Sequence, residues 1–401
     1  MAVTLLAAPT GRAASGSLPL GDPDLVETRT TQVLALGVTL THIVRGADPA
    51  PPDQINTTTR GPWSVNVLTI DPRLANDHLE ATHGPDLAQV ETTTDLVATA
   101  HALAGVNGSF FTFTANPQFP GDPVGLSMAA GRLLSEPSGD PNEADLVVDA
   151  TADRVLLGHL TWSGVVRNRD TDASLPLEFV NHPPVVPSAC AGLADPTACT
   201  VPGDVVRFTP EWGASTPAGN GVEVVLDRLG CVVRTSMTRG ASLAAGQTSL
   251  QATGRDSGAL LDVAGRGCVS QTLRLFDDDG DQVAMRPGLY AVNGRYRLTA
   301  GGEIVVPDGS GSFFDRNPRT IAGTTRDGRI VLATIDGRQT TSVGTTLHET
   351  AAVADALGMS DAINLDGGGS TTMSVRGALV NRPSGSTERA VGDALVYVDQ
   401  P

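Results

Sequence analysis

Hydrophobic and polar positions are patterned most clearly in the C-terminal third of the chain. Ile330–Ile335 is a short apolar run that ends at Asp336-Gly337, which predicts a buried strand followed by a turn. Thr346–Leu357 has helical periodicity, with a capping-box pair in Thr346 and Glu349 and a glycine just after its end. Ala362–Asp366 predicts a second buried strand, which leads into Gly367-Gly368-Gly369-Ser370. We therefore expect Asp366 to lie at the end of a strand.

The rest of the chain carries similar segments with more turns between them. Val33–Val44 alternates as one segment, Trp63–Ile70 predicts a strand, Thr92–Leu103 a helix, and Ala104–Phe111 a strand that enters a turn. Between 155 and 275 many short β-like runs alternate with turns. The pattern predicts an α+β fold with a β-rich, mixed-sheet core and a β-rich insertion at about 160–275.

All four cysteines lie in this predicted insertion, at Cys190, Cys199, Cys231 and Cys268. None belongs to a Cys-x-x-Cys pair, so a zinc site is unsupported. Of the three possible pairings we favour Cys190–Cys199, which closes a short loop, and Cys231–Cys268, which staples two strands. Two disulfides indicate an exported protein.

The N-terminus agrees with export. Residues 1–15 combine a short apolar run with small residues, as in the remnant of a signal peptide, although an irregular terminus would give the same pattern. Residues 16–60 then form an N-terminal extension to a main domain over 61–401. We expect a secreted or cell-envelope protein without a transmembrane segment, because no apolar run approaches the roughly 18 residues that cross a bilayer.

Charge excludes several classes of function. The 401 residues carry a net charge of −17, which argues against a nucleic-acid partner. The sequence contains no lysine, so a Walker-A phosphate site and Schiff-base catalysis are both excluded. Any side-chain clamp on an anion must therefore be built from arginine, which holds phosphate or carboxylate in a bidentate fork.

Four motifs combine residue types that could carry chemistry. Asn364-Leu365-Asp366 with its glycine run places a carboxylate beside backbone amides, although a glycine turn capped by Asp366 is the structural alternative. Arg319 in Arg319-Thr320 is a candidate anion clamp or a surface arginine. Asn107, before Gly108-Ser109, could orient a sugar hydroxyl or a phosphoryl oxygen, and its alternatives are a turn residue or, in a eukaryotic secretory host, a glycosylation acceptor. Glu388-Arg389 is a candidate pair of site residues or a solvated ion pair.

Taken in order, these motifs resemble the phosphodiester glycosidase family. The resemblance spans about residues 60–400 and rests on these segments: Val106–Phe111, Asp122–Gly125, Gly131–Leu133, Pro318–Gly323, Asp336–Arg338, Glu349, Asn364–Ser370 and Pro383–Arg389. Ser109 departs from the family, which often has glycine there, and this puts the local turn in doubt.

The resemblance implies a β-rich fold of the phosphodiester glycosidase type and hydrolysis of the bond between a sugar C1 and a phosphate oxygen. Asp366 would be the nucleophile or base, and Glu349 either a second catalytic group or only the helix cap. Contacts to substrate or phosphate would come from Asn107, Gly108, Arg319, Thr320, Asn364, Gly367, Gly368, Gly369, Ser370, Glu388 and Arg389.

The expected substrate is N-acetylglucosamine or a related sugar in a 1-phosphodiester of a cell-envelope polymer, exopolysaccharide or glycoconjugate. No cofactor is expected, and a divalent cation is left open without support, because Asp277–Asp281 lacks the glycine and distal glutamate of a calcium loop. Two rival hypotheses remain, a glycosidase acting on a neutral glycan and a non-catalytic module that binds envelope glycans. Oligomeric state is not predicted.

Overall fold

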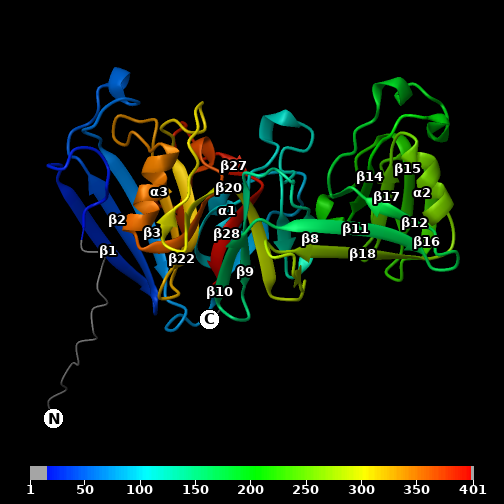
Figure 1. Cartoon of the computed structure of the whole chain (residues 1–401), viewed down its shortest axis with the longest axis horizontal. Coiled ribbons are helices and arrows are strands. Elements are labelled where there is room, and N and C mark those ends of the chain that lie inside the picture. Colours follow the sequence, from blue (N-terminus) through cyan, green and yellow to red (C-terminus); the bar gives the residue numbers. More distant parts are fainter. Residues whose placement is uncertain (1–15, 399–401) are drawn as a thin grey trace, which may run out of the picture.

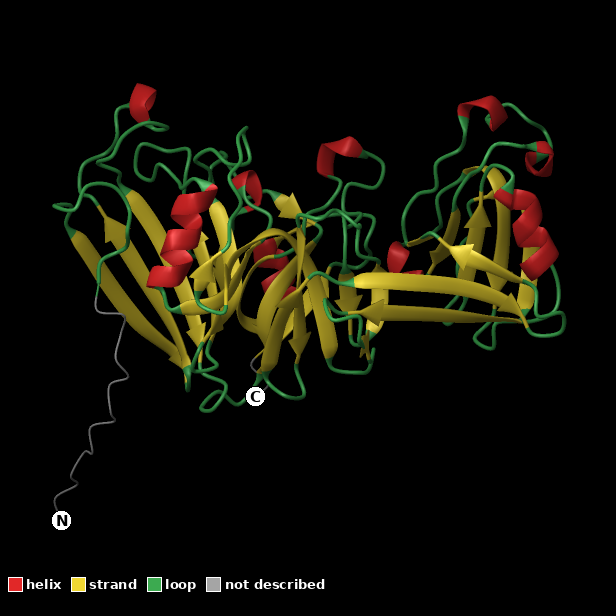
Figure 2. Cartoon of the chain, viewed as in Figure 1, coloured by secondary structure: helices red, strands yellow, loops and turns green. Residues whose placement is uncertain are grey.

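The computed structural model describes residues 16–398, and the predicted signal remnant at 1–15 lies outside them. Strands dominate, with three α-helices in the described part: α1 (Thr93–Thr99), α2 (Asp256–Ala264) and α3 (Leu347–Ala356). The molecule is elongated, with a larger body at one end and a smaller β-rich lobe at the other (Figures 1 and 2). No helix among the described residues is long and apolar enough to cross a membrane.

The body is built on a twelve-stranded sheet and a five-stranded sheet. The large sheet follows the order β1 (Glu27–Ala35), β2 (Val38–Arg45), β3 (Trp63–Ile70), β23 (Ile330–Ile335), β22 (Arg319–Thr325), β24 (Met359–Asn364), β20 (Leu289–Ala300), β7 (Ser127–Ala129) and β8 (Arg132–Ser135), with β9 (Glu143–Asp149), β10 (Arg154–Gly158) and β21 (Glu303–Ile304) attached. The second sheet contains β26 (Ala378–Leu379), β25 (Met373–Val375), β6 (Ala102–Asn107), β28 (Asp393–Val398) and β4 (His78–His83). A short pair joins β27 (Ala390–Val391) to β5 (Glu91–Thr92).

Central strands of the large sheet are buried on both faces. In β3, Leu68 and Ile70 pack toward the second sheet, whereas Val65 and Val67 pack on the opposite face, where α3 contributes Leu347. A strand covered on both sides has no polar face, which explains the unbroken apolar run of β23.

The segment predicted as an insertion forms the smaller β-rich lobe. Long strands β11 (Thr161–Asn168) and β18 (Val269–Phe276) pair with each other and run from the body into the lobe (Figure 1). They form a four-stranded sheet with β12 (Ser174–Leu177) and β19 (Gln282–Val283), and a five-stranded sheet contains β13 (Phe179–Val180), β14 (Val205–Phe208), β17 (Thr248–Ala252), β15 (Gly219–Leu226) and β16 (Val232–Arg239). Disulfides join Cys190 to Cys199 and Cys231 to Cys268, as expected.

Three element boundaries differ from the sequence prediction. The segment Val33–Val44 is a hairpin, because Gly37 takes a positive φ of 74° and turns the chain between β1 and β2. Helix α1 ends before His101, whose φ of 52° breaks the helix and lets β6 begin at Ala102. Strand β24 ends at Asn364, so Asp366 lies beyond the strand in the connection to the second sheet.

Candidate active site

The candidate site lies where the chain passes from the large sheet to the second sheet. Strand β24 ends at Asn364 and the chain re-enters a sheet as β25 at Met373, so residues 365–372 bridge the two. Gly368 has a φ of +61°, and a Cβ on Gly367 would lie 2.9 Å from the carbonyl oxygen of Pro318. The glycine run is therefore required for the close turn that brings Asp366 to the edge of both sheets.

The Asn107 side chain holds this connection between the two sheets in place. Its Nδ2 donates to the carbonyl oxygen of Asp366 at 2.6 Å, while its Oδ1 accepts from Thr320 Oγ1 at 2.8 Å and from the Thr372 amide at 3.1 Å. The Asn107 side chain is fully buried and engaged at both ends. Asn107 and Thr320 therefore hold the chain around Asp366 in place, and their contact with substrate stays a prediction.

Gly108 and Ser109 complete this support. The Gly108 carbonyl accepts from the Asp366 amide at 3.1 Å. Ser109 donates to both carboxylate oxygens of buried Asp393 at 2.6 Å, one from its amide and one from its hydroxyl. Ser109, at the position where the family often has glycine, is thus held by Asp393 on β28.

A cavity of about 250 Å³ opens above Asp366. Its lining includes Arg319, Arg338, Arg389, Asn364, Asn317, Phe110, Phe313, Ser312 and the three glycines Gly367–Gly369. Among the residues that line it, Asp366 is the one carboxylate. Burial raises the pKa of Asp366 to about 6, against the opposing effects of the Ser370 hydroxyl, the Gly367 amide and Arg389.

Arg319 is held at one side of this cavity by neutral oxygen atoms. Its Nη2 donates to the carbonyls of Phe313 and Asp315 at 2.6 and 2.9 Å, and its Nε donates to that of Thr345 at 3.2 Å. Burial, followed by repulsion from Arg338, lowers the pKa of Arg319 to about 10, so it remains a cation at neutral pH. Arg319 thus orders the 313–315 loop and lines the site.

Arg389 and Arg338 approach from two other segments. The Arg389 guanidinium lies over the ring of Phe113 at 4.6 Å and against Gly369, where a Cβ would stand 2.2 Å from Nη2. Arg338 donates twice to Asn317 Oδ1, at 2.7 and 3.1 Å, and lies beside Gly368. Three segments therefore converge on one carboxylate with three cations.

The glycine turn offers fewer amide donors than its sequence predicts. The Gly367 amide donates to Asp366 Oδ1 at 2.9 Å, that of Gly368 to the Pro318 carbonyl at 2.9 Å, and that of Ser370 to the Gly367 carbonyl at 3.1 Å. Three of the four expected donors are thus used within the protein. The arginines, rather than the backbone, supply most of the positive potential.

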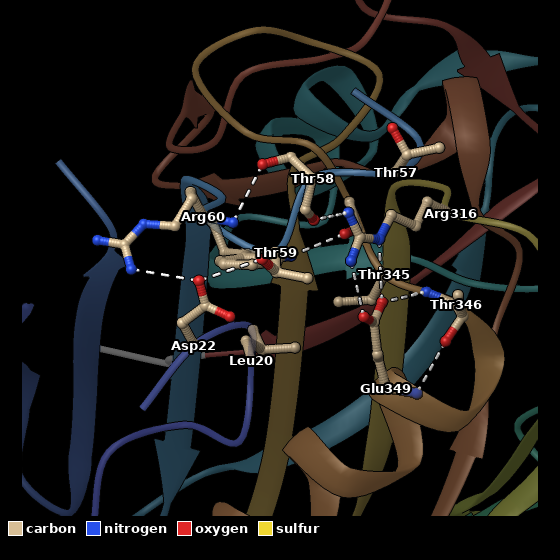
Figure 3. A network of polar contacts seen from close by, with 12 residues as sticks. Leu20, Asp22, Thr57, Thr58, Thr59, Arg60, Arg316, Thr345, Thr346 and Glu349 are labelled. Atoms are coloured by element: carbon tan, nitrogen blue, oxygen red, sulfur yellow. Dashed lines mark hydrogen bonds and ion pairs between the residues drawn. The ribbon is translucent and has the colours of Figure 1, made fainter. Parts of the chain in front are cut away.

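Glu349 is not among the residues that line the cavity, and its side chain is engaged in the polar network at the start of α3 that Figure 3 shows. Its side chain completes the capping box at the start of α3, accepting from the Thr346 amide at 2.9 Å. It also pairs with Arg316 at 2.9 Å, and Arg316 donates to the Thr58 carbonyl at 2.6 Å. These contacts use Glu349 to tie α3 to the N-terminal segment.

Glu388 is likewise structural. Its carboxylate accepts from the amide and hydroxyl of Thr94, at 2.9 and 2.5 Å, in the first turn of α1. These bonds fix the segment that carries Arg389, and a direct contact of Glu388 with substrate stays a prediction.

Sequence reasoning missed Arg338, which lines the cavity, and Phe113, which lies against the cavity residue Arg389. Asp336-Gly337-Arg338 was expected to be a hairpin turn, but Asp336 is buried and accepts from Asn381 Nδ2 at 2.8 Å, which leaves Arg338 facing the cavity. Phe113 was passed over because nothing in its surroundings marks it. Its φ of 47° places a non-glycine residue in the left-handed region, and its ring is 39 % exposed beside Arg389.

Residues that could hold a metal ion are not grouped in the described part of the chain: no cluster of three histidine, cysteine or acidic side chains is present there. The Asp277–Asp281 segment is a turn in which Asp277 Oδ1 accepts the amides of Asp279 and Asp281.

Comparison with known proteins agrees with the motif order. The family model for phosphodiester glycosidases matches residues 220–398, which confirms the resemblance. A solved protein of Burkholderia pseudomallei K96243 that is inferred to be exported is 27% identical, with a TM-score of 0.81 over 98% of this chain and 100% of that one. Together with the two disulfides, this relative fits an extracellular protein.

More distant relatives add the fold alone or a short segment. A hypothetical protein from Synechocystis is 18% identical, with a TM-score of 0.68 over 94% of this chain and 68% of its own. The uncharacterised SPbeta prophage-derived protein YomE of Bacillus subtilis strain 168 is 39% identical over 80 residues, which are 20% of this chain and only 12% of that protein.

Proposed function

We propose that this chain, which matches the phosphodiester glycosidase family model over residues 220–398, hydrolyses the bond between a sugar C1 and the oxygen of a phosphodiester. One observation carries the proposal: a single carboxylate, Asp366, shares a cavity of about 250 Å³ with Arg319, Arg338 and Arg389. A carboxylate suits a positively charged sugar carbon, and arginines suit the departing phosphate.

In the proposed reaction, the oxygen of water becomes attached to C1 and the C1–O bond breaks. Its electron pair leaves with the phosphate, which departs as a phosphomonoester. Asp366 attacks C1 as a nucleophile or removes a proton from the attacking water, and both roles require the ionised form. With a pKa of about 6, most Asp366 side chains are ionised at neutral pH.

A single carboxylate is sufficient because of the leaving group. An alcohol must be protonated as it departs, which is why most glycosidases carry a second carboxylic acid. A phosphomonoester is already a stable anion and needs cations in place of a proton donor. The arginines around Asp366 supply this stabilisation, and the position of Glu349 outside the cavity is therefore consistent with the chemistry.

The substrate is proposed to be an N-acetylglucosamine-1-phosphodiester or a close relative in an envelope polymer, exopolysaccharide or glycoconjugate. Secretion is part of this proposal and is supported by the exported relative and the two disulfides. Phe113 suits such a ligand, because this partly exposed residue beside Arg389 offers an aromatic ring on which a sugar can pack.

The test is release of free sugar from the methyl phosphodiester of N-acetylglucosamine-1-phosphate, followed by NMR. Wild type should release it, and Asp366→Asn should lose at least about 10³-fold of the rate, while the exposed Asp48→Asn retains it. Hydrolysis of an aryl glycoside with no activity on the phosphodiester would replace the proposal by a neutral-glycan glycosidase. Glycan binding without turnover on either substrate would favour the non-catalytic module.

A further inference from the structure

The cavity around Asp366 holds more positive charge than its proposed substrate can neutralise. Arg319, Arg338 and Arg389 contribute three positive charges, and ionised Asp366 removes one. Two further acidic groups lie near Arg319: Asp315, and Glu349, which is already paired with Arg316. Neither of these two acidic groups lines the cavity, and the residues that do line it carry a net charge of about +2, in a chain whose total is −17.

The three guanidinium groups are held in place without an acidic partner. Arg319 bonds to backbone carbonyls, Arg338 to the amide oxygen of Asn317, and Arg389 stacks on Phe113. Within residues 16–398, none of them forms an ion pair. Neutral partners fix the geometry and leave the positive charge available to a ligand.

Holding these positive charges together is energetically unfavourable in the absence of an anion. Burial and the approach of a second arginine lower the pKa values of Arg319 and Arg338. Arg295 adds a further cation nearby, over the ring of Phe110 at 5.2 Å. An anion with two charges offsets this repulsion more completely than an anion with one.

We propose that the cavity is a site for a phosphoryl group with two negative charges, and that it binds a phosphomonoester more tightly than a phosphodiester. A diester carries one charge, whereas a monoester carries nearly two above about pH 7. The inference rests on the proposed function in one respect: the monoester is then the reaction product, and the enzyme is inhibited by what it releases. Inorganic phosphate shares this chemistry and is the alternative source of the ligand.

Binding of small phosphate esters at about pH 8 and low salt tests the charge preference directly. Calorimetry should show methyl phosphate binding about 10- to 100-fold more tightly than dimethyl phosphate. Arg338→Gln is the variant of choice, because this exposed side chain bonds only to Asn317. It should weaken methyl phosphate binding about 10-fold and dimethyl phosphate binding about 3-fold, so that the ratio between the two affinities becomes smaller.

Arg326→Gln is the matched control, because Arg326 is an exposed arginine away from the cavity and should change neither affinity. Equal affinities for the two esters, or an equal loss of both in Arg338→Gln, would overturn the proposal. Inorganic phosphate binding as tightly as methyl phosphate would support the dianion site with free phosphate as its source, and weaker binding would support it with the ester as its source.

Turnover is measured separately, so that the two proposals can fail separately. Methyl phosphate should inhibit sugar release competitively, with an inhibition constant below the KM of the diester. Dianion preference without any sugar release would refute the proposed function and keep the dianion site. Sugar release with no preference for the dianion would support the proposed function and refute the dianion site.

Discussion

Replacing Asp366 by asparagine should abolish catalysis and also stabilise the folded protein at neutral pH. Burial raises the pKa of this carboxyl from 3.8 to about 6, so the ionised form is less stable in the folded site than in the unfolded chain. Asparagine has nearly the shape of the neutral acid and its Oδ1 can still accept the Gly367 amide. The substitution therefore removes the unfavourable charge and keeps the hydrogen bond.

The size and pH dependence of the effect follow from the same shift. Each pKa unit corresponds to about 1.4 kcal/mol, so the change to about 6 gives an upper value of about 3 kcal/mol for the gain in the free energy of unfolding. The folded state binds the extra proton between the two pKa values, and it is favoured at low pH. The advantage of the asparagine variant should be absent below about pH 4, grow as the pH rises, and reach its full size above about pH 7.

Thermal unfolding of wild type and variant across this range provides the assay. A gain of about 3 kcal/mol raises the Tm of a chain this long by a few degrees, on the order of 2–4 °C per kcal/mol or less. A buried carboxyl that does not interact with Asp366, such as Glu136, titrates in both proteins and cancels in the difference. Asp48→Asn controls for the loss of a surface charge. A variant no more stable than wild type at about pH 8, or equally stabilised at about pH 4, would refute the reasoning.

Three other predictions follow from the site and its supports. Wild-type kcat/KM should fall about tenfold per pH unit below about pH 6, as Asp366 becomes protonated; a flat profile would exclude this role. Glu349→Gln should lower the free energy of unfolding, measured by urea titration, by about 1 kcal/mol, because it weakens the bond to Arg316, and it should keep kcat within about threefold. A loss of kcat of about 10²-fold would instead indicate that Glu349 is catalytic. Replacing both Cys231 and Cys268 by serine should lower the free energy of unfolding of the insertion by about 3–4 kcal/mol, because the disulfide joins residues 37 positions apart. It should leave kcat unchanged, because the disulfide lies far from the cavity.

The sequence predicted those parts of the fold that depend on local pattern. Strands β3 and β23 match their expected bounds, because apolar and polar residues alternate along β3 and β23 is a short apolar run that ends at a turn. The α3 cap was recognised because a capping box is a contact between residues three apart. The end of α1 was missed because His101 adopts a left-handed conformation that its residue type does not indicate.

Local sequence motifs were sufficient to predict which segments form the site, whereas the contacts of each residue depend on the tertiary fold. Asp366 and Arg389 were found from short patterns, and both line the cavity. Asn107 belongs to an equally clear motif, yet its amide is consumed by contacts to residues more than 200 positions away. No single-sequence pattern can distinguish an asparagine that faces a ligand from one that joins two sheets.

Arg338 shows the opposite case and explains why charge is the feature of this site that the sequence concealed. Its motif predicts a turn, and the residue reaches the cavity only because Asp336 is anchored to Asn381 and Asn317 holds the guanidinium. The third positive charge thus depends on contacts between segments that are distant in sequence. A site with two arginines beside Asp366 would balance one negative charge, whereas the site with three favours two. The preference of the cavity for a phosphomonoester therefore rests on the one arginine whose role depends entirely on the tertiary fold.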